Sequence, residues 1–466
     1  MKNKNIIEYV TIILISILAF SVIFNNLGTS TFFDWDESHY GEVALEILKT
    51  GDWIMLKYAE QPDSKPPLGA WLIAISFKIF GINEFALRFW SAFLGAETVV
   101  LVYFFGSEIK NECTGIFSAI FLLTTEGFIG YHGARTGDYD VILTFFITLS
   151  LYFFYLNQKR EKRFFLIGSA IAIALGVLVK GVIGLFPVVI IGIYLLFFKS
   201  FKKTLLIKEI IYMIISFCIL VLPLFLYRFI KEKEYFFKVF NYHLLKRINE
   251  PVEGHVGDWS FYFLVLQNVF GKIFFILILA AFTYSLYLLY KKNKPVSLLV
   301  IWISLVMGVF SIAKTKIFWY IIPLYPAISL LIAYNLNILR EFFNIKKSSF
   351  MLISVIIMIS PFLSAIELTQ SVTIDPYLWA IKDLKGELND IDVLYIHMDE
   401  YRQSNFLYLN SYVKEKVNIY KDIRNINMNT GDGIITFNSS RYNFLINSTD
   451  YKLIKSKKIV AVFKKI

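Results

Sequence analysis

Three carboxylates and a histidine lie close together at the start of one short stretch, FFDWDESHYGEV (32–43), directly after an apolar run of the chain. They are Asp34, Asp36, Glu37 and His39. A carboxylate held in place there can accept a proton from an attacking hydroxyl group, and a pair spaced as Asp-x-Asp can also bind a metal ion. The structural alternative is that the acids only cap the following helix, whose dipole favours negative charge. Capping explains one of the three acids more readily than all of them.

Other parts of the chain carry a second acidic pair and several cations. Asp138 and Asp140, in GARTGDYDVILTFF, repeat the Asp-x-Asp spacing. We expect no required cofactor, and a divalent metal held by Asp36 and Asp140 is the alternative. Lys65, in PDSKPPLG, and Lys180, in LVKGVIG, can stabilise negative charge on a leaving group. Other polar residues that lie beside apolar runs of the chain are His132, Arg135, His243, Arg247, His255, Lys316 and Tyr320.

The composition shows what must position these groups. Of the 466 residues, 57% are hydrophobic and 18% aromatic, and the mean hydropathy is +0.59. Runs of about 20 apolar residues recur along the chain, each long enough to cross the hydrocarbon core of a bilayer. The sequence therefore predicts a polytopic α-helical membrane protein in the cell (plasma or inner) membrane.

The positive charge of the chain belongs to the membrane topology rather than to a nucleic-acid site. The formal net charge is +11, but Lys and Arg gather in short loops such as 159–163 and 291–294, as is typical of the cytoplasmic side. No basic stripe with interleaved aromatic residues occurs, so we exclude nucleic acid as a partner. The two cysteines, Cys113 and Cys218, lie at or within apolar spans without metal-ligand company.

With the basic loops inside, about eleven crossings alternate consistently, and the N-terminus is cytoplasmic. We expect a transmembrane domain (1–368) with a first external loop (28–83), and an external α/β domain (369–466) with strands at 392–397, 433–437 and 459–463. The apolar stretch 66–81 is too short for a full crossing and is predicted to be interfacial or re-entrant. The predicted spans are 6–26, 84–106, 113–130, 141–157, 164–179, 183–198, 209–229, 260–290, 296–313, 317–338 and 349–367.

This topology brings ionisable groups from five separate external segments to one face of the membrane. Such groups are costly to hold there and indicate a functional site. In ESHYGEVALEILKTG, the apolar residues follow the spacing of one helix face, which predicts an amphipathic helix on the membrane surface, closed by Gly51. Asp36 then lies at the N-terminus of that helix, where it is held rigidly. The face consists of Tyr40, Val43, Ala44, Ile47 and Leu48.

As an ordered set, several motifs resemble the GT-C membrane glycosyltransferases. They are the Asp-Glu pair after the first span, GDWIMLKY, SKPPLGAWL, FGINEFALRFWSAFLG, GARTGDYDVILTFF, LVKGVIGLFP and KIFWYIIPLYPA. The likeness is greatest to the dolichyl-phosphate-mannose:protein mannosyltransferases and the bacterial lipid A aminoarabinose transferases, and it covers about residues 6–340. The C-terminal domain matches them only in position and general type.

The resemblance implies a polyprenyl- or dolichyl-phosphate sugar as donor, used on the outer (periplasmic or external) face. It implies that Asp36 is the principal catalytic carboxylate, that Lys65 lies near the donor phosphate, and that Asp140 is favoured over Asp138 as the second acid. Glu37 completes the catalytic set. Lys180, Arg247 and Lys316 are the other phosphate-binding candidates, and the substrate-binding candidates are His39, Arg135, His243, His255 and Tyr320.

The predicted reaction is an inverting transfer of the sugar to a lipid (or lipopolysaccharide), glycan or protein acceptor. Asp36 would accept the proton of the acceptor hydroxyl, and the cations would stabilise the leaving phosphate. A lipid-linked glycan polymerase or ligase is the alternative that shares this logic. A transporter or flippase is disfavoured, because that class predicts internal repeats and charges near the bilayer midplane.

Overall fold

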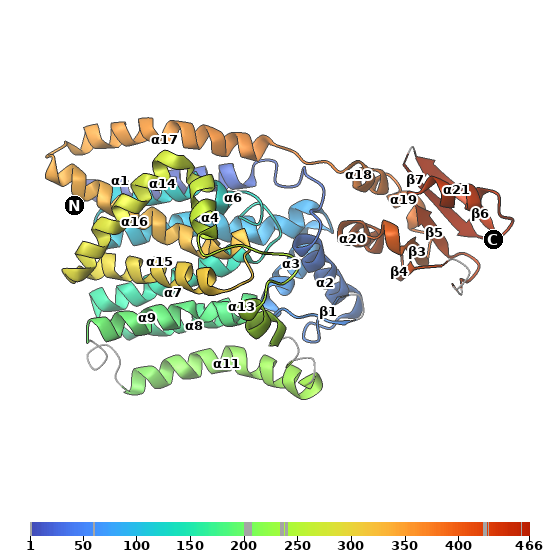
Figure 1. The fold of residues 1–466 in the computed structure, drawn as a ribbon, viewed down its shortest axis with the longest axis horizontal. Helices are drawn as coiled ribbons and strands as arrows, with labels where there is room; N and C mark the ends of the chain where they lie inside the picture. Colours follow the sequence, from blue (N-terminus) through green and yellow to red (C-terminus); the bar gives the residue numbers. More distant parts are fainter. Residues whose placement is uncertain are drawn as a thin grey trace.

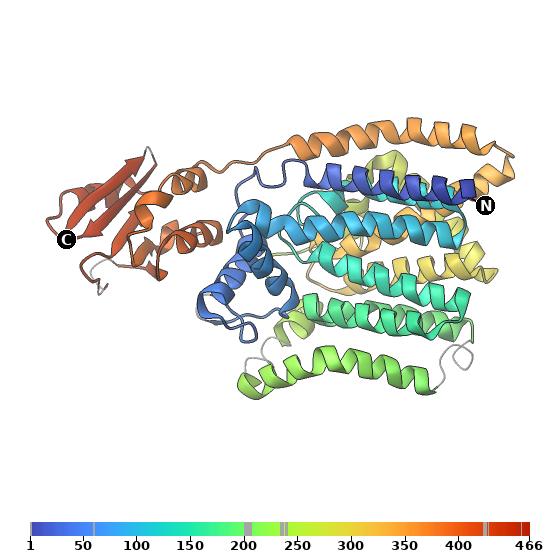
Figure 2. The same ribbon diagram turned by 180° about the vertical axis from the view of Figure 1, so that it is seen from behind.

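The computed structural model describes residues 2–58, 61–199, 207–233, 237, 241–422, 426, 428–457 and 459–466. Over these ranges, long helices lie side by side in a bundle, and a smaller domain with a β-sheet lies beyond one end of the bundle (Figures 1 and 2). The helices of the bundle are α1 (Lys2–Phe24), α4 (Glu84–Ile109), α5 (Glu112–Leu123), α7 (Asp140–Arg160), α8 (Arg163–Lys180), α9 (Phe186–Phe197), α11 (Ile207–Lys231), α14 (Phe261–Tyr290), α15 (Lys294–Ile312), α16 (Tyr325–Phe342) and α17 (Lys347–Gln370).

By length and composition, 9 segments within the described ranges can cross a membrane, as expected of a polytopic helical membrane protein. Eleven crossings were predicted, and two features account for the difference. The segment Arg163–Phe197 is counted once, but it contains α8, the 3-10 helix η1 (Gly181–Leu185) and α9. A Cβ atom at Gly184 would lie 2.3 Å from the backbone nitrogen of Val177, so η1 folds back onto α8. Helix α5 has only 12 residues, about 18 Å, which is shorter than the ~30 Å hydrocarbon core.

The segment predicted to be the first external loop forms a compact unit at the end of the bundle that faces the smaller domain (Figures 1 and 2). It contains α2 (Asp36–Thr50), the hairpin β1 (Lys57–Tyr58) and β2 (Gln61–Pro62), and α3 (Leu68–Phe80). Helix α3 contains most of the stretch predicted to be interfacial. Helix α2 ends at Gly51, whose φ of 74° is the left-handed conformation that favours glycine.

Helix α2 is more deeply buried than an amphipathic surface helix. Most of its predicted apolar face is buried, but Gly41, Glu42 and Leu45 are buried as well. A Cβ atom at Gly41 would lie 2.6 Å from the Leu407 side chain, because a helix of the C-terminal domain, α20 (Gln403–Tyr412), covers that side. The helix predicted to be amphipathic is therefore buried on more than its apolar face, which sequence periodicity does not show because the covering helix α20 lies far later in the chain. Its place on the membrane surface stays a prediction.

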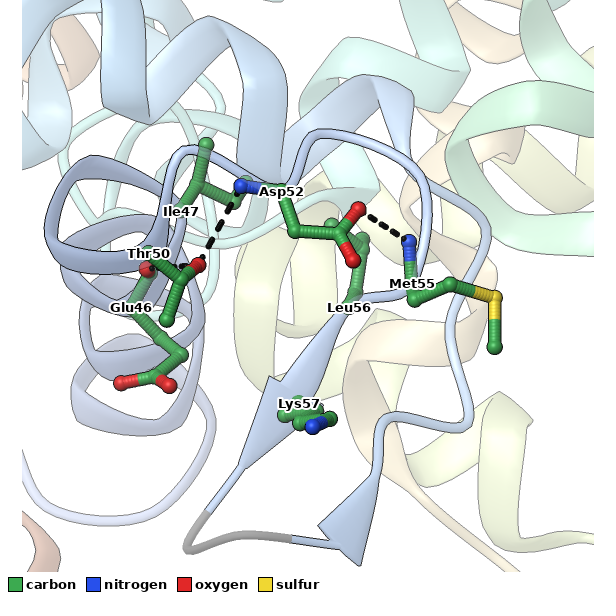
Figure 3. Close-up of a pocket in the computed structure, with 7 residues that line it drawn as sticks. All are labelled: Glu46, Ile47, Thr50, Asp52, Met55, Leu56 and Lys57. Atoms are coloured by element: carbon green, nitrogen blue, oxygen red, sulfur yellow. Dashed lines mark hydrogen bonds between the residues drawn. The ribbon is translucent and has the colours of Figure 1, made fainter.

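A pocket lies at the C-terminal end of α2, where the chain turns into β1 (Figure 3). The Thr50 hydroxyl oxygen accepts a hydrogen bond from the Asp52 N–H (3.2 Å), and Asp52 Oδ1 accepts one from the Met55 N–H (2.9 Å). These bonds form a turn roughly 20 Å along the helix from Asp36. The pocket is thus separate from the ionisable groups at the other end of α2. Its lining is Glu46, Ile47, Thr50, Asp52, Met55, Leu56 and Lys57.

The C-terminal domain (369–466) contains a five-stranded mixed sheet with the order β4-β3-β5-β7-β6. Strand β3 pairs in parallel with β4 and β5, whereas β7 pairs antiparallel with β5 and β6. The three predicted strands correspond to β3, β5 and β7. The two edge strands, β4 and β6, were not predicted, because their alternation of lysine with apolar residues gives a weak signal. The elements are α18 (Pro376–Lys382), α19 (Lys385–Leu388), β3 (Val393–His397), η4 (Met398–Glu400), α20, β4 (Lys416–Tyr420), β5 (Gly433–Thr436), α21 (Ser439–Ile446), β6 (Tyr451–Lys457) and β7 (Val460–Lys465).

Polar contacts attach this domain to α2. Lys49 Nζ donates hydrogen bonds to the backbone oxygen of Asn410 (2.7 Å), to its Oδ1 atom (2.8 Å) and to the backbone oxygen of Glu415 (3.0 Å). The amide of Asn410 donates in turn to the buried carboxyl group of Glu42. The second carboxyl oxygen, Glu42 Oε2, is buried without a hydrogen-bond partner. The interface therefore encloses an acidic group that water does not reach.

We expect this buried acid to make the stability of the protein depend on pH. Burial raises the pKa of Glu42 from 4.5 to about 8, against smaller opposing effects of Asn410 and Lys49. Between these pH values the folded chain binds a proton that the unfolded chain has lost, so the free energy of unfolding falls as the pH rises. Glu42→Gln keeps an acceptor for Asn410 and removes the titration. Between pH 6 and 8, the free energy of unfolding should fall by about 2 kcal/mol more in the wild type than in Glu42→Gln. Equal slopes would contradict the assignment.

Candidate functional site

The predicted catalytic residues lie where helices begin or end at one end of the bundle. Asp36 is the first residue of α2, Asp140 is the first residue of α7, and Lys180 is the last residue of α8. Asp140 Oδ1 and Lys180 Nζ form an ion pair at 2.5 Å. Because α7 and α8 run antiparallel through the bundle, the start of one meets the end of the other. This pairing fixes a carboxylate and an ammonium group side by side.

A tyrosine stack holds α2 against α7. The rings of Tyr40 and Tyr139 lie 3.7 Å apart and nearly parallel, and both side chains are buried. Gly69, at the start of α3, lets the Tyr139 ring approach, since a Cβ atom there would lie 2.4 Å from the ring. Helices α2 and α3 and the start of α7 therefore pack closely around Tyr139, one helical turn along α2 from Asp36. This packing fixes the position of the Asp36 carboxylate.

Asp36 also belongs to a cluster of possible metal ligands. One carboxylate oxygen of Asp36, one of Asp138 and one ring nitrogen of His132 all lie within 4.8 Å of one another. Two carboxylates and an imidazole suit a divalent transition metal with open coordination positions. The metal alternative from the sequence paired Asp36 with Asp140. In the structure, Asp138 and His132 rather than Asp140 lie close enough to Asp36 to bind the same metal ion, and Asp140 is paired with Lys180.

His132 and Asp138 form a buried pair. His132 Nδ1 lies 3.2 Å from Asp138 Oδ2, and the imidazole ring stacks on Trp319 at 3.6 Å. Burial alone would lower the pKa of His132, but Asp138 raises it above its usual value. Conversely, burial would raise the pKa of Asp138, but His132 holds it below its usual range. Each group thus stabilises the charged form of the other.

Asp36 differs from the other acids because its carboxylate is not engaged. In the described part of the chain, neither of its oxygens accepts a hydrogen bond from the protein, and the side chain is half-buried. Asp138 is paired with His132 and Asp140 with Lys180, whereas Asp36 stays open to a ligand. It lies within electrostatic range of Lys65 and Lys180. A free carboxylate beside cations is the arrangement that a general base requires.

Lys65 is the corresponding free cation. It lies in the loop between β2 and α3, and no described acidic group lies within ion-pair distance of its ammonium group. Burial lowers the pKa of Lys65; Asp36 opposes this effect, and the cations Lys180 and Arg247 add to it. Lys65, Lys180 and Arg247 therefore lie within electrostatic range of one another, and Lys65 is the one of the three that pairs with no described acid. Such a group of cations suits a bound phosphate.

Arg247 completes this group through Tyr320. Arg247 begins the short helix α13 (Arg247–Asn249), and its Nη1 atom donates a hydrogen bond of 2.5 Å to the hydroxyl oxygen of Tyr320. Tyr320 lies in the 3-10 helix η3 (Phe318–Leu324), and Lys180 Nζ lies 5.9 Å from the centre of its ring. Tyr320 thus links two of the predicted phosphate-binding cations.

Glu37, predicted with the catalytic acids, makes a different set of contacts. Its two oxygens lie 2.7 and 2.9 Å from Nε and Nη2 of Arg88, and both side chains are buried. The same oxygens accept hydrogen bonds from the backbone N–H groups of Gly137 (2.8 Å) and Phe33 (2.7 Å). A carboxylate with four donors is fully occupied. Glu37 therefore ties α2 to α4 and to the segment before α7.

Two of the predicted site cations contact backbone oxygens at helix ends. Lys316 Nζ donates to the backbone oxygens of Phe310 (3.0 Å), Ser311 (2.6 Å) and Ala313 (2.6 Å), so it caps α15. Arg135 likewise donates to backbone oxygens at the ends of α1 and α17, including that of Ile23 at 2.8 Å. The unpaired carbonyl groups at helix ends attract both cations. The phosphate-binding role of Lys316 and the substrate-binding role of Arg135 stay predictions.

The histidines are distributed around the cluster. His39 Nε2 lies 2.8 Å from Asp63 Oδ1, beside the Lys65 loop. The ring centres of His255 and Trp319 lie 6.3 Å apart, and the two ring planes are nearly perpendicular. His243 lies in the π-helical turn η2 (Asn241–Lys246), and its side chain is outside the described part of the chain.

Sequence reasoning assigned no role to three residues that the fold brings to the site: His132, Asp63 and Arg228. His132 was visible as an external histidine, and a metal-ligand search around Asp138 would have selected it. Asp63 was visible two residues before Lys65 in PDSKPP. Arg228 has no sequence signal, because it lies near the end of an apolar helix like many topological arginines.

The chain is similar to known proteins over much of its length. The family model for dolichyl-phosphate-mannose-protein mannosyltransferase matches residues 13–236. An uncharacterized protein of Aquifex aeolicus is 35% identical over 67% of this chain and 61% of its own length. A second one is 30% identical over 65% of this chain and 67% of its own length. The undecaprenyl phosphate-alpha-4-amino-4-deoxy-L-arabinose arabinosyl transferase of Aeromonas hydrophila is 26% identical over 66% of this chain. This chain spans 56% of that relative, so only about half to two thirds of such proteins is represented.

The fold is shared with a solved structure. The crystal structure of ArnT from Cupriavidus metallidurans bound to undecaprenyl phosphate superposes with a TM-score of 0.74 and covers 97% of this chain and 98% of its own, at 15% sequence identity. The archaeal oligosaccharyltransferase of Archaeoglobus fulgidus gives a TM-score of 0.58 over 87% of this chain. The chain belongs to the dolichyl-phosphate-mannose-protein mannosyltransferase family and has a GT-C membrane fold.

Proposed function

We propose that the protein is a glycosyltransferase that moves a sugar from a polyprenyl-phosphate donor to an acceptor, with inversion at the anomeric carbon. The observation that carries this proposal is the free carboxylate of Asp36 within electrostatic range of Lys65 and Lys180, at one end of the helix bundle. A carboxylate there can activate a nucleophile, and the cations can receive a leaving phosphate whose lipid tail stays in the bilayer.

The proposed reaction is a single displacement. The acceptor oxygen attacks the anomeric carbon and gives its proton to Asp36. The bond between that carbon and the phosphate oxygen breaks, and the polyprenyl phosphate leaves with the electron pair. Lys65, Lys180 and Arg247 stabilise the developing negative charge. The pair of Asp140 and Lys180 keeps the Lys180 ammonium group in place between substrates.

The pair of Asp138 and His132 borders the acceptor side of Asp36. Both groups are buried and in contact with each other, so they hold their orientation without a substrate. A divalent metal bound by Asp36, Asp138 and His132 would add positive charge beside the acceptor oxygen. Glu37 and His39 are positioning residues in this scheme, through their contacts with Arg88 and Asp63. The phosphate-binding role of Lys316 and the substrate-binding role of Arg135 remain predictions.

The donor class is supported by the relatives, whose names specify dolichyl-phosphate-mannose and undecaprenyl phosphate-linked aminoarabinose. The acceptor is a lipid, glycan or protein. To test the function, purified protein is incubated with radiolabelled polyprenyl-phosphate sugars and, separately, with UDP- and GDP-sugars. We expect transfer to a membrane-derived acceptor fraction only from the lipid-linked sugars. Transfer from a nucleotide sugar alone would contradict the proposal.

Lys65 should control the use of the donor rather than the integrity of the fold. Lys65→Gln removes the free ammonium group and leaves the hydrogen bond from its backbone N–H to Asp63 in place. Loss of one charge-assisted contact to phosphate is expected to raise the KM for the donor about tenfold, with a smaller effect on kcat. Steady-state kinetics at varied donor concentration give both values. Lys231→Gln, an exposed lysine on α11, is the control and should leave both unchanged.

We propose that this end of the bundle and the C-terminal domain lie outside the cell, because the basic loops lie at the opposite end. Cysteines introduced at Ser440, exposed on α21, and at Ser348, exposed at the start of α17, report the two sides. The native Cys113 and Cys218 are first replaced by alanine. In intact cells an impermeant maleimide should label Ser440→Cys, and Ser348→Cys should react only after permeabilisation. The reverse pattern would overturn the orientation.

A further inference from the structure

The loop that carries Lys65 is held from two sides. On one side, the Asp63 carboxylate contacts the His39 ring of α2 through Oδ1 (2.8 Å) and accepts the backbone N–H of Lys65 through Oδ2 (3.2 Å). On the other side, Arg228 of α11 donates to the backbone oxygens of Asp63 (2.7 Å) and Lys65 (3.1 Å). Hydrogen bonds thus connect the loop to α2 on one side and to α11 on the other.

The loop needs these partners because two prolines follow it. Pro66 and Pro67 cannot donate backbone hydrogen bonds, and Pro66 restricts Lys65 to extended conformations. The carbonyl groups of Asp63 and Lys65 therefore require side-chain donors. A guanidinium group can bridge both carbonyls at once, because its donors are arranged in a rigid fork.

Arg228 is itself held in place. The Glu232 carboxylate, one helical turn away, lies 3.3 Å from Nη2 and 3.4 Å from Nε of Arg228, and both side chains are largely buried. Helix α11 packs on α8 through Val221, Leu220 and Leu224, and it is the outermost helix on its side of the bundle (Figures 1 and 2). Only 6% of its apolar window is buried. One end of a lipid-facing helix is therefore attached to the phosphate-binding lysine.

We propose that Arg228 is a positioning residue for the donor phosphate: it fixes the Lys65 ammonium group at the site by holding the Lys65 loop against α11. The inference rests on the proposed function. Lys65 makes no ion pair with a described residue that would fix its ammonium group, so the placement of its backbone sets where that group can reach. Within the described ranges, Arg228 is the only side chain that donates a hydrogen bond to the backbone oxygen of Lys65.

The experiment measures binding of radiolabelled undecaprenyl phosphate to the purified full-length protein in detergent. Four variants are compared: Arg228→Met, Arg228→Lys, Lys65→Gln and the double variant Arg228→Met with Lys65→Gln. We expect Arg228→Met and Lys65→Gln each to weaken binding about tenfold, and the double variant to be no weaker than Lys65→Gln alone, because both changes remove the same contact. Arg228→Lys keeps the charge but cannot bridge two carbonyls, so it should also lose affinity.

The matched control is Lys231→Met, which removes an exposed cation from the same helix. It should bind like the wild type. A wild-type affinity for Arg228→Met, or losses that multiply to about hundredfold in the double variant, would overturn the positioning role. A wild-type protein that binds no undecaprenyl phosphate would instead contradict the proposed function. If Arg228→Met does not fold, Arg228→Lys and its double variant with Lys65→Gln give the same comparison.

Discussion

Asp36→Asn is expected to reduce sugar transfer about 10²–10⁴-fold while the purified protein remains folded. The carboxylate accepts no hydrogen bond from the described part of the chain, so the amide leaves no new unpaired partner behind. What it removes is the negative charge and the proton acceptor beside the acceptor oxygen. The loss should therefore fall on kcat, and the donor KM should change little. Initial rates at varied donor concentration give kcat and the donor KM. A thermal unfolding curve for each protein shows whether it remains folded.

Asp52→Asn is the control for Asp36→Asn, because Asp52 is an exposed carboxylate in the same loop between α1 and α4. Its Oδ1 atom accepts hydrogen bonds from the N–H groups of Ile54 and Met55, which an asparagine oxygen can also accept. This variant should transfer sugar at the wild-type rate. Near wild-type turnover of Asp36→Asn would remove Asp36 from the mechanism and with it the proposed direction of attack.

The position of Asp36 could be predicted from the sequence because the membrane imposes strong constraints. Apolar runs fix the depth of each span, and basic loops fix which ends face inward. Asp36, Lys65, Asp140 and Lys180 all lie next to such spans, so counting crossings was enough to bring them to one end. Even the difference between eleven predicted crossings and 9 apolar segments leaves these four residues together.

The role of each acid could not be predicted in the same way. Glu37 and Asp36 are neighbours in the chain, yet Glu37 is buried against Arg88, whereas Asp36 is half-buried with free oxygens. A helix turns by about 100° per residue, so adjacent side chains point in different directions. Which of the two meets Arg88 depends on how α2 and α4 pack, and no local pattern contains that information.

Lys316 and Arg135 show a second limit. In the sequence each is a cation at the external end of a span, just like Lys180. The structure uses them for the carbonyl groups that every helix leaves unpaired at its C-terminus. Lys180 avoids this use because Asp140 lies 2.5 Å away. The difference between a capping cation and a site cation is therefore decided by the nearest neighbour in space.

The Arg88–Glu37 ion pair should be the most important polar contact for the stability of the site. Both side chains are about 1% exposed, and Arg88 also donates to the backbone oxygens of Leu27, Ser30 and Thr31. Arg88→Met leaves a buried carboxylate without its counter-charge. Breaking a buried ion pair from one side costs about 3–5 kcal/mol, because the remaining charge cannot reach water. We expect a loss of this size in the free energy of unfolding, measured by tryptophan fluorescence during denaturant titration in detergent.

Arg160→Met provides the comparison for Arg88→Met, since Arg160 pairs with Glu108 at the surface and is 45% exposed. Water and salt screen such a pair, so its loss should change the free energy of unfolding by less than about 1 kcal/mol. Arg88→Met should also lower sugar transfer, because Glu37 holds the N-terminal turn of α2, where Asp36 lies. Equal stabilities of the two variants would show that the burial of Glu37 does not matter to the fold. A destabilised Arg88→Met protein with unchanged transfer would mean that Asp36 keeps its position without this ion pair.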